Sequence, residues 1–317
     1  MIRRTVPQKT ISKETKLSGV GLHTGKHVTI VFKPAPTNTG IVFVREDIDG
    51  DNLIDAHIKY ISNTDRGTNL DNGTFRIHTS EHVLAAITGL EIDNCFICLD
   101  GPEVPIMDGS SKFFVDALEN AKIVEQNVLR EEFFPSEPIS FECEVSGSRI
   151  SIIPNDTYQI DTIVDYKTKV LGEQEASINH ISEFKTEIAS ARTFSFLHEL
   201  ETLLENGLIK GGDLNNAIVY VDKPLGESNM DILKKAFNKD TISVTPNGIL
   251  DNLDLHYPNE AARHKLLDVI GDLALIGMKI RGKIIAEKPG HSINAKFAQK
   301  VSEVIKSDKK NTLPKIN

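Results

Sequence analysis

Residues 264–277 read HKLLDVIGDLALIG and predict an amphipathic helix with one polar stripe. At about 100° per residue, one broad face collects the apolar side chains Leu266, Leu267, Val269, Ile270, Leu273, Ala274 and Ile276. His264, Asp268 and Asp272 fall opposite, each four residues from the next. An imidazole and a carboxylate at this spacing lie one above the other, close enough to share a cation. The stripe alone leaves open a second interpretation, a solvated polar face.

The composition is that of an ordinary globular protein. The chain has 317 residues, 39% hydrophobic and 26% charged, and we expect two domains or one large one. The net charge of −9 argues against nucleic-acid binding, because no basic patch offsets repulsion from phosphate. No apolar run approaches the ~18 residues of a membrane span, and MIRRTVPQKT lacks the apolar core of a signal peptide. We therefore predict a cytoplasmic protein without stable membrane insertion.

The three cysteines do not form a disulfide framework, because their number is odd and the chain is long. Cys95 and Cys98 make a single CxxC, and no second CxxC follows, which argues against a zinc ribbon. Their surroundings, CFICLD, are typical of a buried strand. We interpret both as buried structural thiols.

Two blocks of the chain each run strands, helix, strand, helix. In the first block we predict strands at 28–32, 41–45 and 94–99 and helices at 81–88 and 112–121. In the second we predict strands at 139–145, 149–153, 159–165 and 279–286 and helices at 264–277 and 294–305. Glu81-His82 and Arg263-His264 take equivalent places at the start of each block's first helix. A two-layer α+β domain, doubled, is the simplest architecture.

The limits of the two domains follow from composition. Residues 125–138 are acidic, carry two prolines and are typical of a junction, so we predict domains at 1–126 and 127–306. Residues 307–317, SDKKNTLPKIN, have the composition of a disordered tail or linker. An insert at about 194–222 interrupts the second domain. It predicts a short helix whose apolar face packs on the core or accepts a ligand, with the side chains Phe196, Leu197, Leu200, Leu203 and Leu204.

Several polar residues stand at the starts of predicted elements. His82 follows Glu81 in the first turn of its helix, and His291 follows Pro289-Gly290 before the last helix. If the halves pack face to face, His82 meets His264 and Asp268. Two imidazoles and one carboxylate, with a fourth position left for water, are the ligand set of a catalytic zinc site. Glu81 then suits a general base, His291 a general acid, and Asp272 a carboxylate that orients the imidazolium.

Six motifs extend this picture over almost the whole chain. They are SGVGLHTGKHVTIVFKPAP at 18–36, TSEHVLAAITGL at 79–90, EVPIMDGSS at 103–111, ARTF at 191–194, RHKLLDVIGDLALIG at 263–277 and EKPGHSIN at 287–294. Together they resemble the UDP-3-O-acyl-N-acetylglucosamine deacetylase family of lipid A biosynthesis. The resemblance implies a Zn²⁺-dependent amidohydrolase that removes acetate from the UDP-linked, 3-O-acylated glucosamine.

The resemblance also implies a role for each motif residue. His82, His264 and Asp268 match the zinc ligands, Glu81 the general base, His291 the general acid and Asp272 the carboxylate that orients it. Thr193 matches a threonine that hydrogen-bonds the oxyanion, and Phe194 a wall near the sugar. Lys265 matches a substrate-contacting lysine, and Lys288 one near the diphosphate. His23 and His78 receive no firm role.

The implied fold has two similar α/β sandwich domains, each with an insert, and an active site at their interface. The insert at 194–222 corresponds to a hydrophobic passage for the acyl chain. In some relatives a dehydratase is fused to this domain, and the lysine-rich tail is a candidate remnant of such a linker.

Two other functions stay open. A zinc amidase for a different acylated amine would share the metal site, and a non-enzymatic acyl-nucleotide scaffold would leave the polar stripe solvated.

Overall fold

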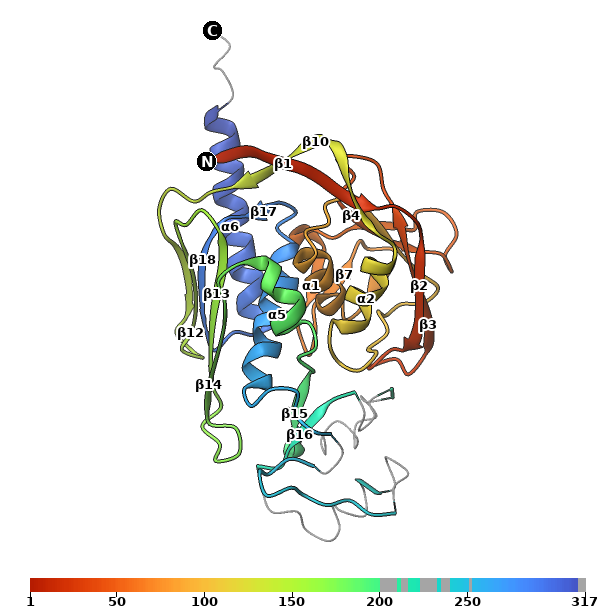
Figure 1. Cartoon of the computed structure of the whole chain (residues 1–317), viewed down its shortest axis with the longest axis vertical. Coiled ribbons are helices and arrows are strands. Elements are labelled where there is room, and N and C mark those ends of the chain that lie inside the picture. Colours follow the sequence, from red (N-terminus) through yellow and green to blue (C-terminus); the bar gives the residue numbers. More distant parts are fainter. Residues whose placement is uncertain (200–209, 212–215, 223–232, 235–239, 251–252, 313–317) are drawn as a thin grey trace.

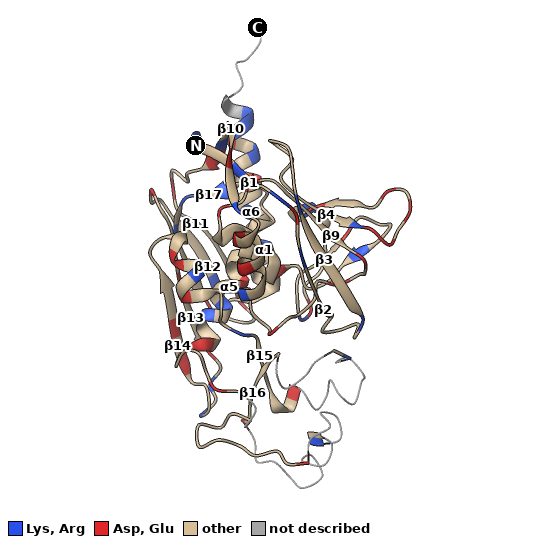
Figure 2. Ribbon diagram, turned by 45° about the vertical axis from the view of Figure 1, so that its right-hand side comes forward, with Lys and Arg blue, Asp and Glu red and all other residues tan. Residues whose placement is uncertain are grey.

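The computed structural model describes residues 1–199, 210–211, 216–222, 233–234, 240–250 and 253–312. The fold is α+β: two five-stranded sheets form the outer layers, and helices lie between them (Figure 1). Within the described residues, no helix combines the length and apolar character needed to cross a membrane. Acidic and basic residues are interspersed over both halves (Figure 2).

The two sheets share one topology. The first has the order β2 (Thr15–Val20), β3 (His27–Pro34), β9 (Cys95–Leu99), β4 (Ile41–Arg45), β5 (Leu53–Asp55). The second has the order β11 (Ile139–Cys143), β12 (Ser148–Ile153), β18 (Gly282–Glu287), β13 (Tyr158–Asp165), β14 (Glu173–Ile178). In each, the last strand of the block inserts between the second and third and runs parallel to the third. The predicted doubling is confirmed.

The helices form the inner layer. They are α1 (Glu81–Gly89), α2 (Lys112–Asn120), α5 (Glu260–Ala274) and α6 (His291–Thr312). A single cluster of buried apolar residues runs through both halves, from Phe32 and Phe43 to Ile160 and Phe297. The two halves therefore share one core and are held together by it.

A third sheet ties the halves together along one edge. Its order is β1 (Ile2–Ile11), β10 (Ile123–Phe133), β17 (Lys279–Ile280). The stretch at 125–138, interpreted above as a junction, thus contains most of a long strand, because β1 supplies it with an antiparallel partner from far along the chain. The domain boundary after residue 126 stays a prediction.

Smaller elements complete the description. A three-stranded sheet comprises β6 (Ile61–Asn63), β7 (Asn69–Asp71) and β8 (Arg76–Ile77), preceded by the 3₁₀ turn η1 (Ile58–Tyr60). A 3₁₀ turn, η2 (Ile181–Glu183), and a π-helical turn, η3 (Phe184–Ile188), precede the insert. The insert contributes β15 (Phe194–Phe196) and β16 (Ile218–Tyr220), which pair in parallel.

Three local expectations need correction. The strand expected at 279–286 is divided between two sheets at Gly282, whose φ is +152° and where a Cβ would lie 2.6 Å from Ile152. Phe196 belongs to β15, so the insert helix begins after it; its continuation from residue 200 lies outside the described residues. The tail expected from Ser307 continues α6 to Thr312, because no proline or glycine interrupts it and Asp308 bonds the amino group of Met1 over 2.8 Å.

Candidate metal centre and active site

Three residues from the two halves converge at the contact between α1 and α5. His82 comes from the first turn of α1, and His264 and Asp268 from successive turns of α5. All three are at least 96% buried, and one ligand atom from each lies within 4.8 Å of the others. The predicted interdomain cluster of two imidazoles and a carboxylate is therefore present in the structure.

The free lone pairs of this cluster point to one place. The Nδ1 of His264 lies 3.0 Å from the carbonyl oxygen of Ala191, which directs the Nε2 lone pair toward Asp268 Oδ1, 3.4 Å away. His82 Nε2 lies 3.9 Å from the same oxygen. Asp268 Oδ1 is buried and has no hydrogen-bond partner among the described residues. A buried carboxylate oxygen facing two imidazole nitrogens lacks a bonding partner that a cation would supply.

The protonation states of His82, His264 and Asp268 also favour a bound cation. Burial, with His264 and His291 nearby, lowers the pKa of His82 to about 3. Burial also lowers the pKa of His264, while burial of Asp268 is outweighed by Lys265 and the imidazoles, which hold its pKa below the usual range. The cluster thus offers two neutral imidazoles and an ionised carboxylate at neutral pH. These are the protonation states that metal binding requires, so the residues fit a divalent cation.

Glu81 stands beside this cluster at the first position of α1. Its carboxylate is 98% buried, and its Oε2 accepts the backbone N–H of Thr68 over 2.9 Å. Burial raises the pKa of Glu81 to about 7, with Asp272 and Asp268 adding to the rise. A carboxylate with a pKa near neutrality is suited to take and release a proton.

His291 occupies the start of α6 and faces Asp272. Its Nδ1–H donates to Asp272 Oδ2 over 3.0 Å, and its Nε2 lies 4.0 Å from Asp268 Oδ2. Burial opposes the charge of His291, but Asp272, Asp268 and Glu81 raise its pKa to about 9. The imidazole is therefore protonated at neutral pH, as a general acid must be.

Two residues absent from the sequence prediction hold Asp272 in place. Thr68 Oγ1 donates to Asp272 Oδ1 over 2.5 Å, and Asn294 Nδ2 donates to Oδ2 over 2.7 Å. Thr68 is 1% exposed and Asn294 is fully buried. Asn294 lay within the EKPGHSIN motif, one helical turn after His291, so spacing could have suggested it. Thr68 precedes a three-residue strand and gives no periodic signal.

Thr68 also anchors the start of α1. Its carbonyl oxygen accepts the hydroxyl of Ser80 over 2.8 Å, so Ser80 takes the N-cap position without capping the helix by its side chain. On the other side, Gly271 of α5 packs on the backbone of Glu81. A Cβ at Gly271 would lie 2.1 Å from the carbonyl oxygen of Glu81.

The remaining predicted residues lie at different distances from the cluster. Lys265 Nζ bonds Asp268 Oδ2 over 2.8 Å, and this partner holds its pKa above the usual range despite burial. The ring of Phe194 lies 6.3 Å from that of His264 and 5.6 Å from Lys265 Nζ. Thr193 precedes it and donates its N–H to Gly109. Lys288 lies apart, partly exposed, 3.8 Å from Asp165.

Comparison with known proteins shows which family the sequence matches. The family described as UDP-3-O-acyl N-acetylglycosamine deacetylase (LpxC) matches residues 8–231 and 227–303. The UDP-3-O-acyl-N-acetylglucosamine deacetylase of Acidithiobacillus ferrooxidans is 37% identical over 293 residues, which are 91% of this chain and 88% of that protein. The enzyme of the same name from Myxococcus xanthus is 37% identical over 297 residues, 93% of this chain and 86% of that protein.

Longer relatives match as well. The bifunctional enzyme LpxC/FabZ of Chlorobaculum tepidum is 44% identical over 301 residues, 94% of this chain and 64% of that protein. The enzyme of the same name from Bacteroides thetaiotaomicron is 42% identical over 299 residues, 94% and 65% respectively. The chain thus spans just under two thirds of these relatives. Their names confirm the expectation that some relatives carry a second activity.

Proposed function

The chain belongs to the UDP-3-O-acyl N-acetylglycosamine deacetylase family, and from this we propose that it hydrolyses the N-acetyl group of UDP-3-O-(3-hydroxyacyl)-N-acetylglucosamine in lipid A biosynthesis. The products are acetate and the free amine. One observation carries the proposal: His82 Nε2, His264 Nε2 and the unpartnered Asp268 Oδ1 converge beside Glu81 and His291. A fold-level likeness without this cluster would not support hydrolysis.

We propose zinc as the cation that His82, His264 and Asp268 hold. Two imidazole nitrogens and one carboxylate oxygen form the open ligand set found in catalytic zinc sites. The chemistry that such a cation supplies is Lewis-acid polarisation of the amide carbonyl and of the attacking water. The hydrogen bond from His264 to Ala191 fixes the orientation of that ring.

The protons move between two residues of the chain. Glu81 accepts a proton as water adds to the carbonyl carbon of the acetamide. His291 then donates its Nε2 proton to the amide nitrogen as the C–N bond breaks, which releases a neutral amine. The pKa values of about 7 for Glu81 and about 9 for His291 place both groups in the required states at neutral pH.

The other predicted residues support substrate binding in this proposal. Thr193 donates a hydrogen bond to the oxyanion, and Phe194 forms a wall beside the sugar. Lys265 contacts the substrate from its place next to Asp268, and Lys288 binds near the diphosphate. Asp272 orients His291.

An apolar surface next to Phe194 suits the acyl chain. The rings of Tyr166, Phe194, Phe196 and Tyr220 pack against one another at centroid distances of 5.3 to 6.4 Å. Phe194 also contacts His264, so this aromatic cluster joins the metal centre to the described part of the insert. We therefore propose that the acyl chain leaves the site along β15 and β16.

The proposal includes a cytoplasmic location. Cys95, Cys98 and Cys143 are all free thiols, and the first two are buried. Free cysteines are typical of a reducing compartment.

Metal analysis combined with an acetate-release assay tests the function. We expect about one zinc per chain, and loss of both metal and activity in His82→Ala and Asp268→Ala. Glu81→Gln should keep the metal and lose roughly two to four orders of magnitude in rate. Full activity in metal-free protein would refute the mechanism. Deacetylation of a simple N-acetyl sugar that a UDP-sugar does not inhibit would instead favour a different amidase.

A further inference from the structure

A cavity lies at the far ends of the two helices that carry the proposed metal ligands. It has a volume of about 640 Å³ and is bounded by β1, β10, the last turn of α1 and the turn from α5 to β17. His82 lies in the first turn of α1 and His264 in the second turn of α5, whereas Ile87 and Leu273 in the last turns of these helices line the cavity. None of the proposed metal ligands lines it.

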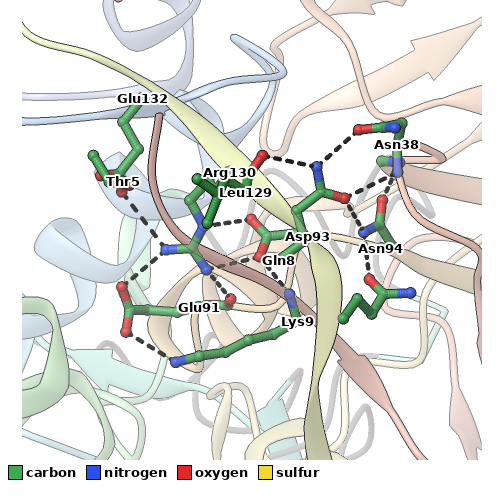
Figure 3. A network of polar contacts seen from close by, with 12 residues as sticks. Thr5, Gln8, Lys9, Asn38, Glu91, Asp93, Asn94, Leu129, Arg130 and Glu132 are labelled. Atoms are coloured by element: carbon green, nitrogen blue, oxygen red, sulfur yellow. Dashed lines mark hydrogen bonds and ion pairs between the residues drawn. The ribbon is translucent and has the colours of Figure 1, made fainter. Parts of the chain in front are cut away.

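The wall of the cavity contains a buried network of charges (Figure 3). Arg130 donates to Asp93 through Nε and Nη2 over 2.7 and 2.8 Å and to Glu91 Oε1 through Nη1 over 3.1 Å. Arg281 donates to Glu132 over 2.6 and 3.0 Å, and Thr5 bonds the other oxygen of that carboxylate. These acids therefore already have cationic partners.

The other two acids of the lining, Glu131 and Asp55, also have cationic partners. Glu131 lies 3.4 Å from Arg4 and 3.9 Å from Lys309, and Asp55 lies 3.4 Å from Lys59. Each carboxylate that lines the cavity thus has a cation within 4.0 Å. Among the described residues, none of these carboxylates forms an ion pair with Lys279, the remaining cation of the wall.

Lys279 supplies a further positive charge. It lies on β17, lines the cavity, and forms no hydrogen bond or ion pair through its ammonium within the described parts of the chain. Burial lowers the pKa of Lys279 to about 8, and Asp93, Glu91 and Glu132 act in the opposite direction from a distance. The ammonium is thus mostly charged at neutral pH. A partly buried cation without a partner is costly unless an anion from outside the chain pairs with it.

Apolar residues from both halves make up part of the remaining lining, beside polar ones such as Gln8 and Asn94. Ile87 of α1, Leu273 of α5 and Met278 before β17 face the cavity beside Lys279. A volume of about 640 Å³ falls within the range of sites for small organic molecules, roughly 300–1,000 Å³. The cavity therefore offers one unpaired cation next to an apolar surface.

We propose that this cavity binds a small amphipathic anion, whose single carboxylate or phosphate group pairs with Lys279 and whose apolar part lies against the ends of α1 and α5. The site is separate from the proposed deacetylase centre and does not depend on it. Because the lining comes from both halves, the bound anion connects β10 and the α5–β17 turn and stabilises the folded protein.

Calorimetric titration of the full, metal-loaded chain tests the proposal. The probes are hexanoate, hexyl phosphate and, as a charge control, hexylammonium. We expect saturable binding of at least one anionic probe, no binding of hexylammonium, and roughly tenfold or greater loss of affinity in Lys279→Met. Comparison of the two anions identifies the head group.

Lys283→Met is the matched control, because Lys283 lies on the neighbouring strand β18 and already pairs with Asp161 over 2.6 Å. It should bind the anion as the wild type does. Without ligand, Lys279→Met should melt no lower than the wild type, since the change removes an unpartnered charge. Lys279→Arg should retain binding.

Three results would overturn the proposal. One is the absence of saturable binding of either anion to the wild type. Another is equal affinity in Lys279→Met and wild type. The third is binding that survives in Lys279→Met and disappears in His82→Ala, which would place the anion at the metal centre.

Discussion

The imidazole of His291 donates its Nδ1–H to Asp272 Oδ2 over 3.0 Å, and this contact joins the start of α6 to the middle of α5. The carboxylate is fully buried and accepts two further hydrogen bonds, from Thr68 and Asn294. These three contacts fix the position of the carboxylate before any substrate arrives. The chemical consequence is an imidazole that stays protonated at a pH where a free histidine is neutral.

The rate of deacetylation should show a bell-shaped dependence on pH. Glu81 must be deprotonated to act as the base, so kcat/KM should rise as the pH passes the Glu81 pKa of about 7. His291 must be protonated to act as the acid, so kcat/KM should fall as the pH passes the His291 pKa of about 9. A bound divalent cation lowers both values, so the limbs lie at or below these figures. The measurement is kcat/KM between pH 5 and 10. A rate that keeps rising above the upper limb would remove His291 from the role of acid.

Asp272→Asn should move the alkaline limb. The substitution keeps the size of the side chain and removes the negative charge that holds the proton on His291. We expect the limb to fall by roughly one to two pH units, while the metal content stays unchanged. Glu131→Gln serves as the control, because Glu131 is a partly exposed acid of β10 that pairs with Arg4 and has no contact with His291 among the described residues. An unchanged limb would mean that Asp272 only packs the site.

Thr68→Val should lower kcat by roughly tenfold without loss of metal, because one oxygen of Asp272 then loses its donor. The backbone N–H that binds Glu81 remains in the variant. Thr68→Ser keeps the hydroxyl and should restore most of the rate. The assay is kcat with parallel metal analysis, and equal rates for the Val and Ser variants would contradict a positioning role.

Much of the fold follows from local pattern. The helix at α5 and strands β3 and β4 were expected within a few residues, because each buries one regular face in the shared core. Local pattern did not reveal the strand within the acidic stretch at 125–138, since its pairing with β1 depends on residues more than a hundred positions away. The hydrophobic pattern of a strand or helix indicates which of its faces is buried, but not which distant strand pairs with it.

The candidate site likewise contains residues that the sequence pattern reveals and residues that it does not. His264, Asp268 and Asp272 share a stripe that spacing alone reveals, and Glu81, His82 and His291 stand at the starts of predicted helices. The resemblance added Thr193, Phe194, Lys265 and Lys288. Thr68 was missed because its contact with Asp272 spans 204 residues and no helical or strand period marks it. The roles of all these residues stay predictions until activity is measured.

Zinc should stabilise the folded chain. Filling a site by ligand at about one hundred times its dissociation constant adds about 2.7 kcal/mol to the free energy of unfolding. We expect zinc to raise the Tm of metal-free wild type and to leave that of His82→Ala unchanged. His198→Ala, which changes an exposed histidine away from the cluster, should respond like the wild type. An equal rise in His82→Ala would place the zinc elsewhere.

Gly271→Ala should impair both stability and activity. The new Cβ meets the carbonyl oxygen of Glu81, so α1 and α5 must separate, at a cost of about 1–3 kcal/mol. Gly147→Ala provides the comparison: it lies in a turn with open space around it and carries only the strain of a φ of +65°, about 1–2 kcal/mol. Melting curves and kcat distinguish the two, since only the change at Gly271 displaces Glu81. Full activity in Gly271→Ala would show that the separation of the helices does not matter.

The contact between the backbones of Gly271 and Glu81 limits how the proposed deacetylase centre can be redesigned. Because Gly271 has no side chain, the backbones of α1 and α5 pack directly against each other there. The distance between Glu81 and His264 is therefore set by the packing of these two helices and not by side-chain rotamers. Substitutions at this contact between α1 and α5 are therefore a poor route to a variant that accepts a substrate with a bulkier amide. A larger binding site would instead require substitutions in the aromatic cluster around Phe194 and Phe196, whose rings lie 6.4 Å apart.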